Sequence, residues 1–283
     1  MLQRNYTIRT MSRQELDIAV EWAAQEGWNP GWHDAGCFHA ADPQGFLVGM
    51  LGDEPIATIS AVKYGASFGF MGCYIVKPKQ RGAGYGIKIW QAAIAYLHGR
   101  NIGLDGVVAQ QDNYRRSGFK LAHRNIRYQG TGGKPAVRDG RVVPLSTLSF
   151  AALQAYDQPF FPEQRQSFLR CWTQQPDSTA LGILQNGKLA GYGVLRACRN
   201  GCKIGPLFAD NAELADALFI ALQAQAPENA AIFLDTPETN PAAIELAQRH
   251  GMSASFETAR MYTGSFPDLP MQRLFGITTF ELG

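Results

Sequence analysis

The chain has 283 residues, 46% hydrophobic and 18% charged, a composition typical of globular proteins that excludes a mainly disordered one. Its formal net charge of +2 is too small to argue for binding to nucleic acid or to a membrane surface. No apolar run approaches the roughly 20 residues that cross a bilayer, and the first residues lack the apolar core of a signal peptide. We therefore expect a cytoplasmic protein, and the length favours two domains.

A strand at residues 6–9 and a helix are predicted at the start of the chain. Ser12 and Glu15 have the spacing of a capping box, which marks the beginning of that helix. After the helix, the stretch from Glu26 to Asp34 combines two tryptophans with glycine and proline. This composition predicts a shaped loop, which either carries functional groups or covers the core with its tryptophans.

A hairpin, a long strand and a glycine-dense turn come next. Residues 46–51 and 56–62 flank a turn, and the apolar run at 68–76 predicts a buried strand. Residues 82–86 contain three glycines, and the pattern at 87–98 is helical. A strand, a glycine-dense turn and a helix start in this order favour an anion-binding site.

The glycine-dense turn is suited to phosphate. Gly82, Gly84 and Gly86 can adopt backbone angles closed to other residues, so that successive N–H groups converge beside the positive end of the following helix. A P-loop is not indicated, because Gly86 is followed by Ile87 and Lys88 with no hydroxyl residue. A Rossmann fingerprint is not indicated either, because its sixth position, counted from Gly82, is Ile87.

The spacing that this turn does fit is Arg-x-x-Gly-x-Gly, on Arg81, Gly84 and Gly86. It resembles the pyrophosphate loop of the GCN5-related N-acetyltransferases, the GNAT superfamily. Val76 and Pro78 match the Val-x-Pro segment that leads into that loop. A tight turn that merely begins a helix is the alternative reading of these glycines.

A second segment resembles the same family. A predicted strand at 104–109 is followed by Asn113, Tyr114 and the pair Gly118-Phe119. This matches the second GNAT signature, in which an Asn precedes a short helix that ends Tyr-x-x-x-Gly-Phe. Because both signatures occur in the family order, the chain is identified by resemblance as a GNAT protein.

The resemblance implies acetyl-CoA as the acyl donor and no metal. In the family, the strand before the glycine loop lies along the pantetheine arm and the loop amides bind the pyrophosphate. Tyr114 would protonate the departing thiolate, because a phenol is protonated at neutral pH; the alternative is a merely packed aromatic ring. The cofactor-binding residues implied in this chain are Tyr74, Ile75, Val76, Arg81, Gly82, Ala83, Gly84, Tyr85, Gly86 and Asn113.

The loop after the first helix walls the acceptor pocket in the resembled fold. We predict that Glu26 or Asp34 is the general base, with a chain of water molecules as the alternative route for the amine proton. The predicted acceptor-binding residues are Trp28, Trp32 and His33.

The second half of the chain repeats the order of elements of the first. Residues 131–143, dense in glycine and proline at their start, predict a linker. Gly187 in a hairpin turn lies 134 positions after Asp53, and Gly251 lies 133 positions after Gly118. This near-constant offset predicts an internal duplication of the fold.

The second copy lacks the chemistry of the first. Asp210 and Glu213 put negative charge where a pyrophosphate would bind, and Ala247 stands where the offset from Gly251 would place the tyrosine. The tail at 275–283 has β character and is expected to complete a sheet. The five cysteines predict reduced thiols, with Cys198 and Cys202 flanking a hairpin turn rather than binding metal.

These observations predict an α+β protein of two tandem GNAT-like domains, each a mixed, mostly antiparallel twisted sheet flanked by helices. The strand at 121–128 is expected to close the sheet of the first half. The expected division is a catalytic domain at 1–130, a linker at 131–143 and a degenerate domain at 144–283. The predicted activity is acetyl transfer from acetyl-CoA to a primary amine of a small molecule in a ternary complex, by a monomer or homodimer. The alternatives are a protein or peptide lysine acetyltransferase and a non-catalytic acyl-CoA-binding sensor.

Overall fold

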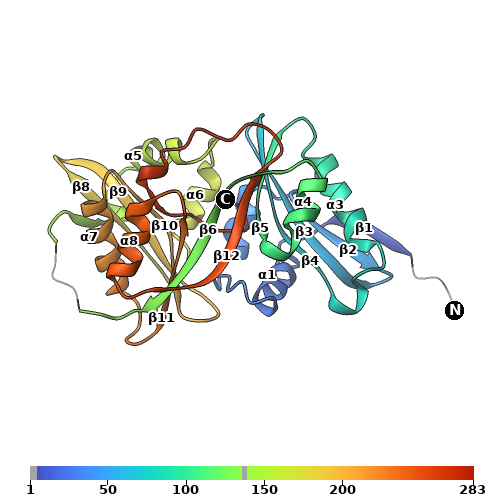
Figure 1. Ribbon diagram of the computed structural model, residues 1–283, viewed down its shortest axis with the longest axis horizontal. Helices are drawn as coiled ribbons and strands as arrows, with labels where there is room; N and C mark the ends of the chain where they lie inside the picture. The colour runs from blue at the N-terminus through green and yellow to red at the C-terminus, as the bar shows by residue number, and fades with distance from the viewer. Residues whose placement is uncertain (1–4, 136–138) are drawn as a thin grey trace.

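A computed structural model describes residues 5–135 and 139–283, and it divides them into two halves with the same order of elements (Figure 1). Residues 136–138 of the predicted linker lie outside the described residues, and the domain limits at 130 and 144 remain a prediction. The first half runs β1 (Tyr6–Thr10), α1 (Leu16–Gln25), α2 (Asp34–Ala41), β2 (Phe46–Leu51), β3 (Glu54–Tyr64), β4 (Phe68–Val76), α3 (Tyr85–Tyr96), β5 (Asn101–Val107), α4 (Gln111–Arg116) and β6 (Lys120–Thr131).

The second half follows the same sequence of strands and helices. It runs β7 (Val142–Pro144), α5 (Phe150–Asp157), α6 (Gln166–Trp172), β8 (Ser178–Gln185), β9 (Lys188–Ala197), β10 (Cys202–Ala209), α7 (Ala212–Gln223), β11 (Ala231–Pro237), α8 (Pro241–Arg249) and β12 (Ser253–Tyr262). A last strand, β13 (Leu274–Gly276), has no counterpart among the described residues of the first half. The predicted tandem α+β architecture is therefore confirmed.

All described strands belong to one continuous, mostly antiparallel sheet. Its order is β1-β2-β3-β4-β5-β12-β6-β11-β10-β9-β8-β7, with β13 beside β10. From either end, the sheet begins with the first five strands of one half in chain order. The sixth strand of each half is exchanged, so that β12 lies beside β5 and β6 lies beside β11. Figure 1 shows β6 and β12 side by side in the middle of the molecule.

The exchange of β6 and β12 corrects one expectation from the sequence. The strand at 121–128 was expected to close the sheet of the first half, but β6 pairs with β11 and β12, and it is β12 that pairs with β5. Both exchanged strands are fixed by a buried ion pair in register. Arg127 of β6 faces Asp235 of β11, and Arg260 of β12 faces Asp105 of β5.

Local sequence signals determine where several helices begin. The backbone N–H of Glu15 donates to Ser12 Oγ at 3.2 Å and the N–H of Ser12 donates to Glu15 Oε2 at 2.8 Å, so the predicted capping box precedes α1. Asn211 and Asn240 accept hydrogen bonds from backbone N–H groups at the starts of α7 and α8.

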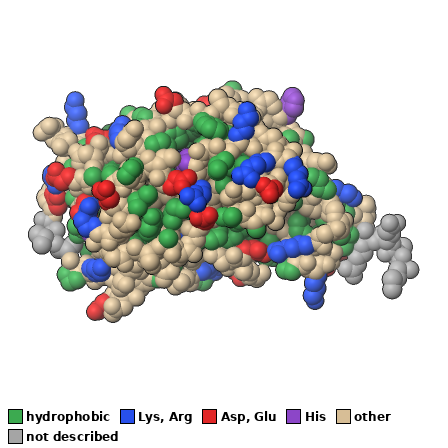
Figure 2. Space-filling model, in the orientation of Figure 1, with side chains coloured by type: hydrophobic (Ala, Val, Ile, Leu, Met, Phe, Trp, Pro, Cys, Tyr) green, Lys and Arg blue, Asp and Glu red, His purple; other side chains and the backbone are tan. Residues whose placement is uncertain are grey.

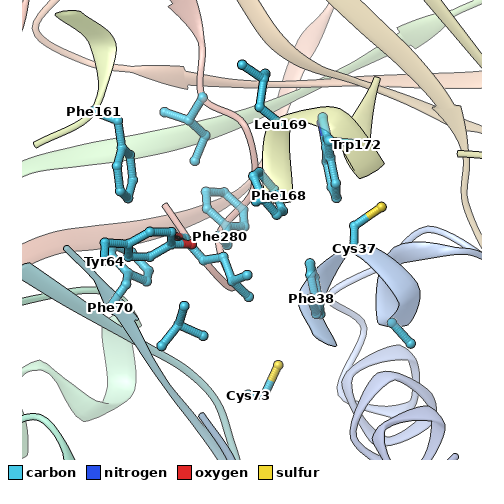
Figure 3. Close-up of a cluster of buried hydrophobic side chains, with 14 of the residues drawn as sticks. Cys37, Phe38, Tyr64, Phe70, Cys73, Phe161, Phe168, Leu169, Trp172 and Phe280 are labelled. Atoms are coloured by element: carbon cyan, nitrogen blue, oxygen red, sulfur yellow. Dashed lines mark hydrogen bonds between the residues drawn. The ribbon is translucent and has the colours of Figure 1, made fainter. Parts of the chain in front are cut away.

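A shared apolar core joins the two halves (Figure 3). Helix α2 packs against α6, and the rings of Phe38 and Trp172 stack with their centroids 6.4 Å apart. Phe168 stacks on the same tryptophan at 5.0 Å. Because these rings come from both halves and are fully buried, separating the halves would expose a large apolar surface.

The cysteines are free, as expected, but two of them meet. Cys37 of α2 and Cys171 of α6 have their sulfur atoms 2.7 Å apart. Cys198 and Cys202 flank the turn between β9 and β10, as predicted. Among the described residues, no group of histidine, cysteine and acidic side chains is arranged to hold a metal ion.

The tail after β12 passes from the second half into the first. Strand β13 pairs with β10, which confirms part of the expected β structure, whereas the segment that follows it is irregular. Its apolar side chains Ile277, Phe280 and Leu282 are buried. The tail therefore ends beside β4, near the middle of the molecule (Figure 1).

The surface charge and the length of the helices are typical of a globular protein. On the face shown in Figure 2, basic and acidic side chains are interspersed with apolar ones. No helix among residues 5–135 and 139–283 is both long and apolar enough to cross a membrane.

Candidate active site

A cleft of about 600 Å³ opens where β4 and β5 diverge. The two strands pair in parallel only from Phe68 to Met71 on β4 and from Asn101 to Leu104 on β5. Beyond these residues β4 continues beside β3, and β5 continues beside β12. The separation leaves main-chain groups of both strands facing a common space, into which a ligand can lay its chain.

A β-bulge shapes the β4 side of the cleft. The register between β3 and β4 shifts between Thr58 and Ser60, and Cys73 has a φ of 47°, which is unusual for a non-glycine residue. The hydroxyl of Thr58 donates to the carbonyl oxygen of Cys73 at 2.9 Å and stabilises the bulge. The bulge redirects the chain just before Tyr74, Ile75 and Val76, which line the cleft.

The glycine loop lies at one end of the cleft. Gly82 and Gly84 have φ values of 77° and 82°, which favour glycine, and Gly84 immediately precedes α3. No side chain caps this helix and its first turn has no acidic residue, so its first N–H groups and the positive end of its dipole are available to an anion. Gly86 has a different role, because a Cβ there would lie 2.6 Å from the Tyr74 hydroxyl oxygen.

Arg81 braces the loop. Its Nε donates to the Val76 carbonyl oxygen at 2.8 Å, and its guanidinium forms an ion pair with Glu26. The side chain of Arg81 is half exposed and that of Glu26 is about one-third exposed, so solvent screens the pair. Glu26 lines the cleft, but in this arrangement its carboxylate is engaged by Arg81.

Tyr114 of α4 lines the same cleft. Its ring stacks on Trp90 of α3, with centroids 5.5 Å apart, and lies against β5 at Gly106, where any Cβ would collide with it. Burial, with a smaller contribution from nearby Tyr74, raises the pKa of Tyr114 to about 12. The phenol is therefore protonated at neutral pH and able to donate a proton.

The second half supplies much of the opposite wall. Phe256 and Thr258 come from β12, and Phe280 and Glu281 come from the tail. Sequence reasoning missed all four, because they enter the cleft only through the strand exchange and the path of the tail. The β character of residues 275–283 was the one signal that pointed to a role for this segment.

The wall is completed by the loop after α1, which the second half holds. Asn29 and Asn200 exchange two hydrogen bonds, of 2.9 and 2.8 Å. The carbonyl oxygen of Trp28 accepts a hydrogen bond of 2.8 Å from Arg127. The predicted loop is thus firmly held, and Trp28 lines the cleft.

The structure separates the predicted site residues into two groups. Those that line the cleft are Glu26, Trp28, Tyr74, Ile75, Val76, Arg81, Gly82, Gly84, Gly86 and Tyr114. Outside its lining lie Ala83, Tyr85, Asn113, Trp32, His33 and Asp34.

The residues outside the lining have identifiable partners. Tyr85 packs on Tyr6, with ring centroids 4.8 Å apart. Trp32 and His33 border a separate depression beside Cys37 and Cys171. Asp34 is fully buried and accepts a 2.7 Å hydrogen bond from the N–H of Gly31. Desolvation raises the pKa of Asp34, and the nearby charge of Arg196 opposes this shift. Asn113 donates to Gln110 at 2.6 Å.

The corresponding space in the second half is filled. Strands β10 and β11 pair in parallel only from Cys202 to Ile204 on β10, but β13 pairs with β10 beyond that point. Helix α7 is capped by Asn211, and Asp210 accepts hydrogen bonds from Tyr156 and Arg273. In the described part of the second half, β13 therefore occupies the place of the cleft and a side chain caps the helix start.

Comparison with known proteins gives the same family in each half. Residues 10–119 match the acetyltransferase (GNAT) family, and residues 153–276 match an acetyltransferase (GNAT) domain. A holothin acyltransferase of Pseudoalteromonas sp. (strain SANK 73390) is 28% identical over 280 residues, which are 99% of this chain and 95% of that protein.

Two solved structures have a similar fold along the chain. A Pyrococcus horikoshii protein assigned as an acetyltransferase superposes with a TM-score of 0.84 at 20% identity, over 100% of this chain and 98% of its own. A tandem GNAT protein from the clavulanic acid biosynthesis pathway superposes with a TM-score of 0.64 at 14% identity, over 93% of this chain and 100% of its own.

Fold, cleft and relatives together define the class of the molecule, which is an acyltransferase. The chain belongs to the GNAT superfamily, as a tandem protein with one family domain in each half.

Proposed function

We propose that the chain transfers an acetyl group from acetyl-CoA to a primary amine of a small molecule, by direct attack in a ternary complex. The observation that carries the proposal is one cleft that has an uncapped helix start at one end and the protonated phenol of Tyr114 inside it. The related holothin acyltransferase supports acyl transfer by a chain of this architecture.

The donor is assigned to the side of the cleft formed by β4 and the glycine loop. The amides of residues 81–86 and the start of α3 would bind the pyrophosphate, because an open helix N-terminus stabilises an anion. The pantetheine arm would lie along Tyr74, Ile75 and Val76, as predicted. Ala83, Tyr85 and Asn113 remain proposed contacts for parts of the cofactor that extend beyond the cleft.

The chemistry requires four changes in bonding. The neutral amine attacks the thioester carbonyl carbon, and the carbonyl oxygen gains negative charge that main-chain N–H groups can stabilise. The tetrahedral intermediate then expels the CoA thiolate and leaves the amide. Tyr114 donates its proton to the sulfur, and the amine nitrogen loses one proton to a base.

Of the two carboxylates predicted as that base, only Glu26 lines the cleft. Its ion pair with Arg81 would have to open for it to act. Asp34 is buried outside the lining, so a proton would have to reach it by relay. Trp28 is the predicted acceptor contact that the cleft supports, whereas Trp32 and His33 would contact an acceptor only if it extended beyond it.

The two other candidate functions fit these features less well. A peptide acceptor would favour an open acidic groove, but the wall at Trp28, Phe256 and Phe280 is aromatic. A sensor without turnover has no need for a proton donor at Tyr114. The proposed site is expected to operate in a cytoplasmic monomer or homodimer, with residues 1–130 carrying the donor chemistry.

The test is amine-dependent release of CoA thiol from acetyl-CoA. We expect one thiol for each N-acetylated amine with the parent protein, and a loss of at least 100-fold for Gly84→Glu, which puts a strained and negatively charged residue in the anion site. Gly187→Glu is the matched control, because Gly187 also has positive φ (74°) but lies in a hairpin of the second half. Failure of a folded parent to release thiol with any amine would overturn the proposal.

A further inference from the structure

One carboxyl group that lines the cleft, that of Glu281, has an oxygen atom without a hydrogen bond among the described residues. Three acidic residues line the cleft among the described residues, namely Glu26, Asp105 and Glu281. The first two are held by arginines. Oε2 of Glu281 accepts the hydroxyl of Thr279, but Oε1 is buried with no hydrogen bond among the described residues. An unmet buried acceptor of this kind suits a charged donor on a ligand.

The tail holds Glu281 firmly where the strands part. Its side chain is buried, with 3% of the residue exposed. Its carbonyl oxygen lies so close to Gly72 that any Cβ there would collide with it, and Gly72 follows the last β4 residue that pairs with β5. The Tyr64 hydroxyl donates to the carbonyl of the next residue, Leu282, at 3.2 Å. The main chain at Glu281 is therefore fixed where β4 and β5 separate, and Glu281 forms part of the cleft lining there.

The rest of this wall is apolar. Trp28, Phe256 and Phe280 line the cleft from the loop, β12 and the tail. The rings of Phe256 and Phe280 are 6.1 Å apart, and the Arg127 guanidinium lies 4.8 Å from the Phe280 ring centroid. That arginine is buried and bound to Asp235, so it does not offer a free charge to a ligand.

We propose that Glu281 binds the ammonium group of the acceptor and takes its proton, and that the acceptor is a monoamine with an apolar body held by Trp28, Phe256 and Phe280. This inference rests on the proposed acyl transfer and adds to it the base and the acceptor class.

The step balances with the groups already described. One N–H bond of the ammonium breaks, and its proton binds to Oε1 of Glu281. The nitrogen lone pair then forms the bond to the thioester carbon, and the C–S bond breaks toward sulfur. Tyr114 donates its proton to the thiolate. As the amide forms, the nitrogen loses its second proton, which the tyrosinate of Tyr114 accepts. Glu281 then returns its proton to solvent as the products leave.

Charge argues against acceptors with several ammonium groups. Among the described residues, Glu281 carries the only buried carboxylate oxygen of the cleft lining without a hydrogen bond, while the more exposed carboxylate of Glu26 is paired with Arg81. A polyamine would bring further ammonium groups against aromatic rings with no carboxylate free to neutralise them. Burying an unpaired charge is costly, so a monoamine is preferred.

Charged and titratable groups reach Glu281 from several elements. Asp34 of α2, Cys73 of β4, Arg127 of β6 and Arg196 of β9 all interact with it electrostatically. A pH response alone would therefore not identify the group responsible. Substitution of Glu281 itself does so, with a carboxylate outside the cleft lining as the control.

The experiment compares the parent with Glu281→Gln, Glu281→Asp and the control Glu257→Gln, whose residue lies on β12 outside the cleft lining. The probes are acetyl-CoA, 2-phenylethylamine as an apolar monoamine and spermidine as a polyamine. Acetyl-CoA binding is measured by titration calorimetry, and N-acetylation is measured from pH 6 to pH 10.

We expect Glu281→Gln to bind acetyl-CoA like the parent and to acetylate 2-phenylethylamine about 100-fold more slowly at pH 7. That deficit should shrink by about tenfold per pH unit, because free alkylamine in solution rises tenfold per unit below its pKa of about 10. Glu281→Asp should retain part of the rate, Glu257→Gln all of it, and spermidine should be the poorer acceptor.

Each of the other outcomes would overturn a defined part of the proposal. If Glu281→Gln acetylates as fast as the parent, or is slow by the same factor at every pH, Glu281 is not the base although acyl transfer stands. If the parent binds acetyl-CoA but does not acetylate 2-phenylethylamine, or prefers spermidine, the acceptor inference is wrong. If the parent does not bind acetyl-CoA, the proposed function itself fails and the role of Glu281 falls with it.

Discussion

Tyr114 reaches β5 only because residue 106 is glycine. A Cβ at that position would collide with the tyrosine ring, and Trp90 stacks on its other side. The ring is therefore fixed, and its burial both orients the hydroxyl and raises its pKa to about 12. At the scale of single residues, glycine positions determine which aromatic groups can enter the cleft.

Replacement of Tyr114 by phenylalanine tests its proposed role as acid. We expect kcat to fall by about 100-fold or more, because the thiolate must leave without a proton, while affinity for acetyl-CoA changes little. Since the raised pKa keeps the parent phenol protonated up to about pH 12, the parent should show no loss of activity near pH 10 from this group. Equal kcat values for the two proteins, measured as thiol release from pH 6 to pH 10, would contradict the role.

The exchanged strands are fixed by two equivalent ion pairs. Arg127 binds Asp235 with contacts of 2.6 and 2.8 Å, and Arg260 binds Asp105 with contacts of 2.9 and 2.6 Å. The two arginines are 133 positions apart, the same offset as between Gly118 and Gly251. In each half, an aspartate on the fifth strand thus binds an arginine on the sixth strand of the other half.

Breaking one of these pairs should be costly. Among the described residues, Arg260→Ala leaves buried Asp105 with Asn125 as its one remaining side-chain hydrogen-bond donor, and we expect a loss of about 3–5 kcal/mol in the free energy of unfolding. The double variant Arg260→Ala, Asp105→Ala should recover part of that loss. Urea unfolding of the parent, Arg260→Ala, Asp105→Ala and the double variant measures the coupling, and additive losses would show that the pair does not stabilise the β5–β12 contact.

Helices α2 and α6 should be open to cross-linking by oxidation. The sulfur atoms of Cys37 and Cys171 are 2.7 Å apart, and the Cys37 thiol, by donating a hydrogen bond, lowers the pKa of Cys171 to about 7. With dilute hydrogen peroxide we expect one disulfide, formed with loss of two hydrogens from the thiols and reduction of the peroxide to water. Mass spectrometry of peptides should find this link in the parent and not in Cys37→Ser; its absence from the oxidised parent would contradict the prediction.

Across the whole molecule, the two halves contribute different parts of one cleft within one sheet. The first half presents the glycine loop and Tyr114, while the second contributes β12 and the tail to the opposite wall. The second half fills its own equivalent space with β13. Among the described residues, both copies therefore contribute to the lining of one cleft.

A sheet with exchanged strands should unfold as a single unit. One edge of β5 is covered by β12 of the second half, and one edge of β11 is covered by β6 of the first half. Neither half can therefore unfold without exposing a strand edge of the other. We expect one calorimetric transition with equal calorimetric and van't Hoff enthalpies. Two separate transitions would mean that the halves are independent in stability.

How much of this was predictable depended on whether the signal was local. The capping box at Ser12, the glycine loop before α3 and the order of elements in each half are short-range patterns, and the structure confirms them. The exchange of β6 and β12 was not predictable, because both copies carry the same arginine and acidic partner and either pairing would satisfy them. Glu281 was missed for a different reason, because its place depends on the path of an irregular tail.

Isothermal titration with acetyl-CoA counts the donor sites of the chain directly. We predict one site per chain, lost in Gly84→Glu and retained in Gly187→Glu, which carries a similar backbone strain in the second half. Two sites per chain, or undiminished binding by folded Gly84→Glu, would contradict a single donor site at the start of α3.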